Sequence, residues 1–409
     1  MTTARTRLPR PLLAVAAATA LLLSGCQGAF QPATADPGAT ATDPAAQPEA
    51  SATPTPTPES ATVSVSAMGD MLPHDSVTAD ALQPDGTYDY GQFFDAARPI
   101  WADSDLVYCN QEAPSAGVEL GLTYYPAFNA PREFAEGIAD AGCNVIGFGN
   151  NHTFDRGQEG VDRTRAVWDE LDPLLFAGGF RSPEEQAEVP VTEVDGLAVA
   201  FLSFVDLSNT PTNDHVVTWL DDPLVEQQLA EAEEVADATM VAVHWGNEYS
   251  AVVSDRQREQ AQRLADLGAD VILGTHPHVL QEAEWIERAD GTRAFVYYSL
   301  GNALSTQMAV PRVVSAVAQF DLVGEPGGPV EVVDPAAVPL YMHFDLTPAQ
   351  FQSGAWVNRR NLQLHPLVDA AEPITRSAWR NELTVESGVQ LVTDVLGPDV
   401  RIVTESFAP

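Results

Sequence analysis

Side chains that could bind metal ions follow several apolar segments of this 409-residue chain. The chain has only eight histidines, and five of them lie in these short polar segments. Two divalent ions about 3.5–4 Å apart need a bridging carboxylate and several terminal nitrogen or oxygen ligands. The candidate ligands are Asp70, His74, Glu112, Asn151, His244, His276 and His278. Such a set is what a two-metal hydrolase needs, and it makes a polar site the leading hypothesis.

The motifs differ in strength when each is taken alone. His276 and His278 flank a proline directly after an apolar segment, which is the strongest single signal. Asn151 and His152 follow another such segment, where burying polar groups without partners is costly. A lone histidine such as His244 is more often a structural core residue. The complete set favours a metal site, and it leaves His152 free as a proton donor near a leaving group.

The candidate ligands begin where predicted strands stop. From residue 63 to about 301, apolar runs alternate with amphipathic stretches, as in an α/β domain. Ligands of open α/β sheets bind outside the carboxyl ends of the strands, so the fold and the motifs agree. The predicted strands are 62–68, 106–109, 144–149, 197–204, 239–243 and 271–273, with a hairpin of 285–287 and 294–298. The predicted helices are 93–102, 132–141, 160–171, 224–236 and 255–267.

The remainder of the chain carries no motif of this kind. Residues 313–323 and 330–344 predict further strands, which could complete a second sheet, and 377–396 predict a helix. We therefore treat residues 325–409 as a C-terminal extension without an assigned chemical role.

The two internal cysteines are expected to stay unpaired. Cys109 ends one predicted strand, and Cys143 precedes the next. If these strands run parallel, the cysteines lie at opposite ends, roughly 15 Å apart at ~3.3 Å per residue. A disulfide cannot bridge that distance.

The N-terminal residues 1–26 have the pattern of an export signal. Three arginines precede an apolar run, 12–23, that is too short to span a bilayer. The run ends in Leu-Ser-Gly-Cys, which resembles the lipobox of bacterial lipoproteins and implies lipidation of Cys26. Cleavage of an ordinary secreted protein is the alternative. Residues 27–60 are rich in Ala, Thr and Pro and predict a disordered linker. We expect an extracytoplasmic protein anchored by lipid to the bacterial cell membrane.

The charge of the chain limits its partners. There are 58 acidic residues against 20 basic ones, which gives a net charge of −38, and every basic residue is arginine. Such a surface argues against nucleic acid as a tightly held partner. High solubility is the simplest role for the acidic excess.

Together, the motifs resemble the CapA family of poly-γ-glutamate capsule biosynthesis proteins, a branch of the calcineurin-like metallophosphoesterases. The matching stretches are Met-Gly-Asp at 68–70, Asn-Gln-Glu at 110–112, Gly-Asn-Asn-His at 149–152, His-Trp-Gly-Asn-Glu-Tyr at 244–249, His-Pro-His at 276–278 and Tyr-Ser-Leu-Gly-Asn at 298–302. The resemblance implies an α/β fold, a four-layer α/β/β/α sandwich within residues 61–324.

The resemblance also implies roles for individual residues. Asp70, His74 and His278 would hold one ion, while Asn151, His244 and His276 would hold the other. Glu112 would bridge the ions, and His152 would be the catalytic acid, with Asp70 also counted as catalytic. Substrate-binding or supporting positions would be Asn110, Asn150, Trp245, Glu248 and Asn302.

Two departures weaken parts of this assignment. The superfamily has Asp-x-His where this chain spaces Asp70 and His74 four residues apart. It also has Gly-Asp-x-x-Asp where this chain has only Asn-x-Glu ending at Glu112. His74 and Glu112 are therefore the least secure ligands.

The resemblance implies a surface-anchored protein of cell-envelope polymer biosynthesis. We expect a metal-dependent hydrolase or transferase with two divalent ions (Mn, Fe or Zn), acting on a polymer such as poly-γ-glutamate, beside polymer-synthase subunits. The alternative is a non-catalytic subunit that exports or anchors the polymer. A fold that has lost its activity is a third reading, disfavoured because so many ligand types remain.

Overall fold

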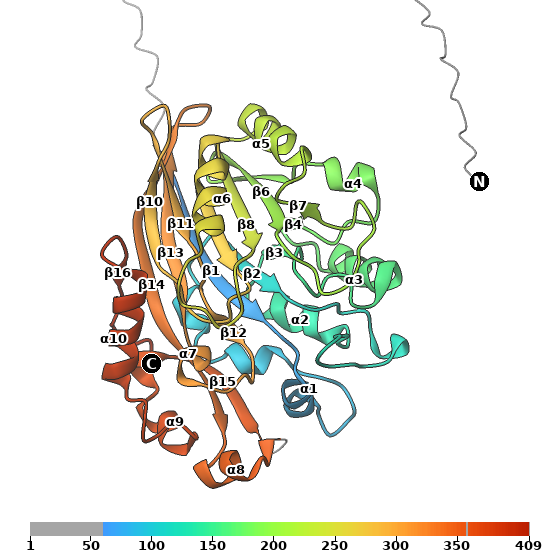
Figure 1. Cartoon of the computed structure of the whole chain (residues 1–409), viewed down its shortest axis with the longest axis vertical. Helices are drawn as coiled ribbons and strands as arrows, with labels where there is room; N and C mark the ends of the chain where they lie inside the picture. The colour runs from blue at the N-terminus through green and yellow to red at the C-terminus, as the bar shows by residue number, and fades with distance from the viewer. Residues whose placement is uncertain (1–59, 357–358, 409) are drawn as a thin grey trace, which may run out of the picture. The chain divides into compact units, whose positions relative to one another are not determined.

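The structure is a computed structural model that describes residues 60–356 and 359–408 (Figure 1). The predicted signal segment with Cys26, and the linker apart from Ser60, lie outside the described residues. Within the described ranges, we find no helix with both the length and the apolar composition needed to cross a membrane.

The larger of two β-sheets is built around β1, which ends at the candidate metal site. Its main order is β15-β14-β13-β1-β2-β3-β4, with β12 beside β1 and β16 beside β14. Strands β1 to β4 run parallel, whereas β13 is antiparallel to β1. The strands are β1 (Ala61–Met71), β2 (Leu106–Gln111), β3 (Val145–Gly147), β4 (Leu175–Ala177), β12 (Asn302–Leu304), β13 (Val314–Gly324), β14 (Val330–Asp345), β15 (Arg360–Pro366) and β16 (Arg401–Ile402).

The smaller sheet faces the larger one across the core. Its order is β10-β11-β9-β8-β6-β5, with β7 beside β6, and its inner strands run parallel. Every residue of β8 and β9 is buried, as expected for strands that are covered on both faces. The strands are β5 (Val191–Val194), β6 (Leu197–Val205), β7 (Thr218–Trp219), β8 (Ala238–His244), β9 (Val271–Thr275), β10 (Ala283–Glu287) and β11 (Arg293–Tyr297).

Helices cover the outer faces of both sheets. Helices α5 and α6 pack against the smaller sheet, while α2 and α10 pack against the larger one. The predicted α/β/β/α sandwich is therefore confirmed (Figure 1). The helices are α1 (Asp75–Ala81), α2 (Glu133–Asp140), α3 (Gly157–Leu171), α4 (Pro183–Ala187), α5 (Leu224–Val235), α6 (Asp255–Asp266), α7 (Val310–Val313), α8 (Pro348–Ser353), α9 (Ala371–Arg376) and α10 (Val385–Leu396).

Helix α6 illustrates how the sequence specifies these elements. Ser254 caps its N-terminus by accepting a hydrogen bond from the backbone of Gln257, whose side chain accepts one in return. Ala261, Leu264 and Ala265 lie on one side of the helix and are buried, and this spacing gives an amphipathic helix one apolar face.

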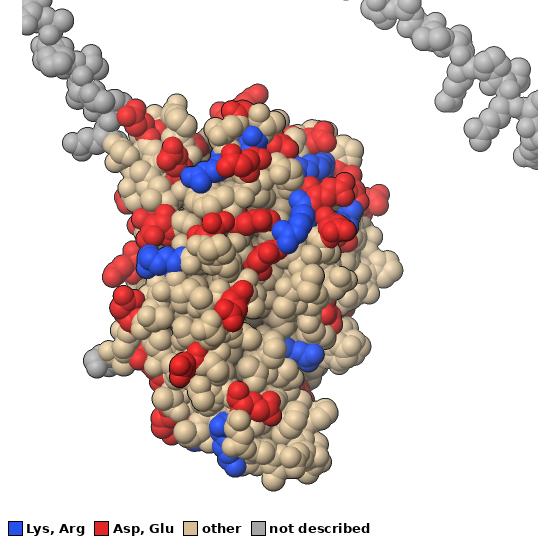
Figure 2. Space-filling model, turned by 60° about the vertical axis from the view of Figure 1, so that its left-hand side comes forward, with Lys and Arg blue, Asp and Glu red and all other residues tan. Residues whose placement is uncertain are grey.

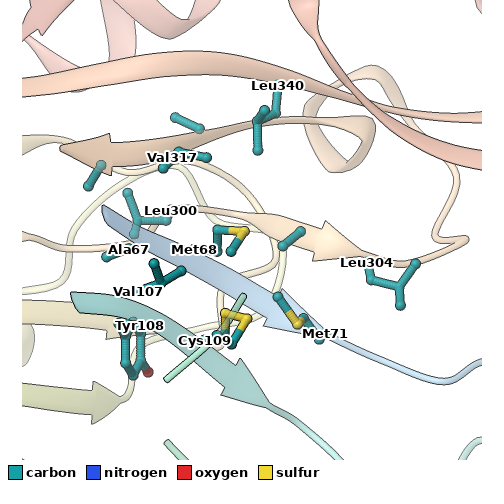
Figure 3. Packing of buried hydrophobic residues seen from close by; sticks show 14 of the residues in the cluster. Ala67, Met68, Met71, Val107, Tyr108, Cys109, Leu300, Leu304, Val317 and Leu340 are labelled. Atoms are coloured by element: carbon teal, nitrogen blue, oxygen red, sulfur yellow. A yellow bond between two sulfur atoms is a disulfide. The ribbon is translucent and has the colours of Figure 1, made fainter. Parts of the chain in front are cut away.

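Apolar side chains from both sheets form one core. Val65, Phe201 and Leu273 come from different strands and belong to the same buried cluster. Tyr108 of β2 packs against Phe201 of β6 across the sheets, with ring centroids 5.6 Å apart. Figure 3 shows the part of this core around Met68 and Met71 of β1. Burial of one such side chain stabilises the fold by about 1.5–3 kcal/mol, which fixes the strands that carry the site.

The C-terminal strands join the larger sheet, not a separate one. Strand β14 pairs antiparallel with β13, and β15 pairs with β14. The strands predicted at 313–323 and 330–344 are thus confirmed, but the second sheet is completed by other strands. The division of the chain at 324/325 stays a prediction.

Two predicted helices are wrong in their extent. Residues 93–102 form two short 3₁₀ helices, Gly91–Phe94 and Arg98–Ile100. Pro99 lacks a backbone donor and disfavours helical backbone before it, which prevents a continuous α-helix. The C-terminal helix begins only at Val385, because Thr384 caps it with its side chain.

Cys109 and Cys143 form a disulfide with Cα atoms 5.9 Å apart, so our expectation of unpaired cysteines is wrong (Figure 3). Strand β2 continues beyond Cys109 to Gln111, which places that cysteine inside the strand. Gly142 has a φ of 102°, a conformation that glycine adopts readily. The chain therefore turns between α2 and β3 and does not enter β3 as an extended segment, which brings Cys143 onto Cys109.

The described surface is strongly acidic. Figure 2 shows Asp and Glu side chains spread over one face, with fewer arginines among them. Most arginines form ion pairs with nearby carboxylates, such as Arg258 with Glu282 and Glu284.

Candidate metal centre

The carboxyl ends of strands from both sheets meet at the candidate site. Asp70 is the penultimate residue of β1, Glu112 follows β2, and Asn151 lies on the loop after β3. His244 is the last residue of β8, and His276 comes directly after β9. The sequence-predicted position of the site, where the parallel strands end, agrees with the structure.

Close approach of two backbone segments positions Asp70. Its backbone N–H donates to Gly301 O at 2.9 Å. A Cβ atom at Gly69 would collide with the same carbonyl, so only glycine fits before this aspartate. The Asp70 carboxylate accepts from Asn110 Nδ2 at 2.9 Å and lies 2.8 Å from His278 Nδ1.

The predicted ligands form two groups that share Glu112. Asp70, Glu112 and His278 make one group, and Glu112, His244 and His276 make the other. In each group the candidate ligand atoms lie within 4.8 Å of one another. Glu112 Oε1 is 3.6 Å from His244 Nε2 and 3.7 Å from His278 Nε2.

Asn151 extends the second group. Its Oδ1 lies 3.0 Å from His244 Nε2, and the same nitrogen is 3.1 Å from His276 Nδ1. Two polar atoms from separate loops thus lie within about 3 Å of an imidazole nitrogen at the end of β8. An amide oxygen and imidazole nitrogens are both suitable ligands for a divalent ion.

The donor set fits divalent cations. Both carboxylate oxygens of Glu112 are buried and have no hydrogen-bond partner within the described part of the chain. Leaving a buried carboxylate unpaired is costly, and a cation on each side would satisfy both oxygens. Glu112 therefore has the position expected of a bridging ligand, and both of its carboxylate oxygens are free to bind a cation.

Burial shifts the protonation of the candidate ligands. Burial and the neighbouring Asp70 carboxylate raise the pKa of Glu112 well above its usual value. Burial opposes ionisation of Asp70 as well, but the hydrogen bond and the charge of His278 outweigh it and lower that pKa. Burial and the neighbouring imidazoles lower the pKa of His244 well below its usual value and that of His276 to about 4. Neutral imidazoles are the form that binds metal.

The loop after β9 is held in an unusual backbone conformation. His276 has a φ of 97° and His278 a φ of 58°. Residues with a Cβ atom avoid this region at a cost of about 1–3 kcal/mol each, and such strain gathers at functional sites. Tyr249, with a φ of 65°, donates its backbone N–H to Pro277 O at 2.7 Å and supports the loop.

Supporting residues orient the ligands. Thr275 Oγ1 lies 2.9 Å from His244 Nδ1, so the opposite nitrogen, Nε2, faces Glu112. Asn302 Nδ2 donates to His278 O at 3.2 Å. Such contacts fix the ring orientation of a ligating histidine. Sequence reasoning missed Thr275, although its place directly before His276 was a usable signal.

His152 forms a buried pair with Asp155. Its Nδ1 lies 2.7 Å from Asp155 Oδ2, and its Nε2 lies 3.3 Å from Asn209 Nδ2. The ring packs edge-on to Phe128, with centroids 4.7 Å apart. The carboxylate therefore fixes the orientation of the imidazole, with Nε2 on the opposite side of the ring and in contact with Asn209. Sequence reasoning missed Asn209, which carries no motif.

His74 lies outside both ligand groups. Its ring packs against Phe128 at 5.7 Å, and its Nδ1 is 3.5 Å from Thr306 N. Burial and the nearby charge of Arg359 lower its pKa to about 3. The predicted role of His74 as a ligand gains no support from these contacts.

Of the other predicted supporting residues, one contacts a candidate ligand directly and others make structural contacts. Asn110 contacts Asp70 directly, and Asn150 joins two loops through a hydrogen bond from its Nδ2 to Gln111 O at 2.8 Å. Trp245 is a buried residue of the smaller sheet's core, with its indole donating to Tyr298 O at 2.9 Å. Glu248 is exposed.

Comparison with known proteins gives two curated relatives. The chain is 29% identical to the PGA biosynthesis protein CapA of Bacillus subtilis (strain 168) over 298 residues, which are 71% of this chain and 73% of that protein. It is 30% identical to the capsule biosynthesis protein CapA of Bacillus anthracis over 242 residues, 56% of this chain and 57% of that one.

Solved structures show only distant similarity. An NAD nucleotidase of Haemophilus influenzae matches 70% of this chain and 52% of its own, with a TM-score of 0.42 and 13% identity. A purple acid phosphatase from yellow lupin seeds matches 68% of this chain and 54% of its own, with a TM-score of 0.34 and 11% identity.

The family model described as "Bacterial capsule synthesis protein PGA_cap" matches residues 64–307. This range contains every candidate metal ligand, and it agrees with the resemblance of the motifs. The chain therefore belongs to the bacterial capsule synthesis protein PGA_cap family.

Proposed function

We propose that the chain is a metal-dependent hydrolase or transferase that acts on a cell-envelope polymer such as poly-γ-glutamate. The observation that carries this proposal is the shared carboxylate of Glu112, which is buried and unpartnered among the described residues and stands between two groups of ligands. A purely structural carboxylate at this position would lack the pairing that buried charges need.

The site residues would divide the work as follows. Asp70 and His278 would hold one divalent ion, His244, His276 and Asn151 the other, and Glu112 would contact both. Bound ions would supply Lewis-acid polarisation of the substrate oxygen. His152 would hold a proton at Nε2 for the leaving group, with Asp155 stabilising the charged ring.

The length of β1 separates the end of the predicted linker from the candidate site. Strand β1 starts at Ala61, directly after the predicted linker, and carries Asp70 near its other end. Nine residues of extended strand span about 30 Å at ~3.3 Å per residue. Lipidation of Cys26 would tether the chain to the membrane through residues that precede β1, and polymer or synthase subunits would meet the site at the other end of this strand.

Metal analysis of the purified chain tests the proposal. We expect about two divalent ions per chain after reconstitution with Mn, Fe or Zn, and clearly fewer in His276→Ala and His278→Ala at unchanged circular dichroism. His215→Ala serves as the matched control, because His215 lies outside both ligand groups. A wild-type chain that takes up no divalent ion would overturn the proposal.

A non-catalytic role in polymer export or anchoring is the second candidate. The names of both relatives refer to biosynthesis, not to hydrolysis. His152→Ala separates the two roles, because His152 lies outside both ligand groups and the variant should retain its metal. Loss of turnover on bis(p-nitrophenyl) phosphate or an oligo-γ-glutamate would support catalysis. Polymer binding by a wild type without turnover on either substrate would support the non-catalytic role.

A further inference from the structure

Arg312 differs from most arginines of this acidic protein. It makes no ion pair with any carboxylate of residues 60–356 and 359–408, although acidic residues outnumber basic ones almost threefold. Its guanidinium carbon instead lies 3.6 Å from the ring centroid of Tyr249. By contrast, Arg359, which also approaches the site, pairs with Asp75 at 3.4 Å. The charge of Arg312 is therefore available to an external anion.

Tyr249 connects Arg312 to the metal centre. The tyrosine ring lies 5.9 Å from the ring of His278, tilted by 36°. The guanidinium of Arg312 can be no farther from that imidazole than these two stacking distances combined. Tyr249 is 43% exposed, whereas His278 is only 2% exposed. The stacked pair therefore stands where the buried centre opens to solvent.

Asn302 fixes the two loops relative to each other. Its side-chain amide donates to His278 O at 3.2 Å and to Arg312 O at 3.0 Å. The backbone of Tyr249 is fixed in turn by its hydrogen bond to Pro277 O. Arg312, Tyr249 and His278 are thus held as one unit, so the position of the guanidinium is preorganised.

We infer that Arg312, stacked on Tyr249, is a binding site for a substrate carboxylate beside the metal centre. A guanidinium presents a planar fork of donors that matches a carboxylate, and stacking on an aromatic ring leaves the donor edge free. Every unit of a γ-linked glutamate polymer carries one free carboxylate. Arg312 would bind the carboxylate of a unit next to the reacting carbonyl. This inference rests on the proposed function and adds the class of group that is recognised.

The proposed carboxylate site at Arg312 also explains how a strongly acidic protein could bind an anionic polymer. A chain with a charge of −38 repels a polyanion at long range. At physiological salt this repulsion is screened beyond about 8 Å, while a direct arginine–carboxylate contact is not. Recognition of an anionic polymer then depends on local cations, and Arg312 is one that stays uncompensated at the site.

Binding of a short polymer tests the inference without requiring turnover. The probe is tri-γ-glutamate, titrated calorimetrically into the full Mn²⁺-loaded chain at 0.15 M salt. We expect Arg312→Gln to weaken binding at least tenfold at unchanged metal content, and Arg312→Lys to weaken it less. The tripeptide with its α-carboxylates converted to amides should bind wild type and Arg312→Gln equally weakly.

Arg293→Gln is the matched control. Arg293 also stacks on an aromatic ring, with its guanidinium carbon 4.2 Å from the Trp285 centroid, but it lies on the β10–β11 hairpin. Its substitution should leave tripeptide binding unchanged. Equal binding by wild type and Arg312→Gln would overturn the inference while the metal content still supports the proposed function. Displacement of the tripeptide by inorganic phosphate, from wild type only, would overturn the carboxylate assignment in favour of a phosphoester.

Discussion

Substituting Glu112→Gln is expected to have opposite effects on the metal-free and the metal-loaded protein. Both oxygens of Glu112 are buried without a hydrogen-bond partner in the described structure, and the Asp70 carboxylate is a close neighbour whose charge disfavours ionisation. An unsatisfied buried group costs about 1–3 kcal/mol, and more when charged. A neutral amide of the same shape can donate to Asp70. The free energy of unfolding of the metal-free protein should therefore rise by about 1–3 kcal/mol.

Bound metal should reverse the order of stability of the wild type and Glu112→Gln. An ion present at 1,000 times its dissociation constant stabilises the folded protein by about 4.1 kcal/mol, which exceeds the gain of about 1–3 kcal/mol expected for the metal-free variant. Glu112→Gln loses the one ligand that both groups share, so its gain from metal should be much smaller. The wild type should be the more stable protein in Mn²⁺, and the variant should be the more stable one in EDTA.

Urea unfolding followed by tryptophan fluorescence measures both effects, because the chain has seven tryptophans. Glu331→Gln, an exposed position on β14, is the matched control and should follow the wild type in both buffers. If Glu112→Gln destabilises the protein in EDTA and gains as much from Mn²⁺ as the wild type, Glu112 is not a shared ligand.

Three further substitutions test other parts of the structure. Replacing Cys109 and Cys143 together with alanine should lower the free energy of unfolding by about 3–4 kcal/mol in urea titrations, since the disulfide closes a loop across a sequence separation of 34; equal stability would contradict the bond. In EDTA, His278→Gly should be more stable than His278→Ala by about 0.5–1 kcal/mol, because a φ of 58° strains any residue with a Cβ atom; the reverse order would refute the strain. Burial and the charge of His343 lower the pKa of His365 to about 4. As the pH falls below about 6.5, His365 is protonated in the unfolded chain but stays neutral in the folded protein. The free energy of unfolding therefore decreases as the pH falls from about 6.5 to 4. Urea titrations at a series of pH values should show that the free energy of unfolding depends less steeply on pH in His365→Gln than in the wild type. An unchanged pH dependence would contradict the lowered pKa of His365.

Sequence reasoning found the strands because their signal is local. Buried parallel strands appear as continuous apolar runs, and the polar residues after Met68, Val243 and Leu273 mark where such runs stop. The position of the site follows from the strand ends, so Asp70 and His276 could be placed before any coordinates were known.

The errors arose where the tertiary structure decides the local backbone. A positive φ at Gly142 turned the chain toward Cys109, and strand pairing could not reveal that turn. The role of His74 came from its spacing and the family pattern and stays a prediction; its ring packs against Phe128 and lies outside both ligand groups. From the sequence, Arg156 and Arg312 could each steer an anionic group, but an ordinary ion pair with one of the many acidic residues was the more probable role for each. The contacts of the described residues show that Arg312 stacks on Tyr249 next to His278 and forms no ion pair.

Strand β1 would bear mechanical load if the chain were tethered through its N-terminal residues, as we propose. It is paired with β13 over Ala61–Ala67 and with β2 from Val65 to Met71. A pull on the chain at residue 60 acts along the strand axis, so it loads these hydrogen bonds in shear, many at once. The tension is thus spread over two neighbouring strands before it reaches Asp70. If the chain is tethered as proposed, the load would fall on the centre of the larger sheet before it reached Asp70.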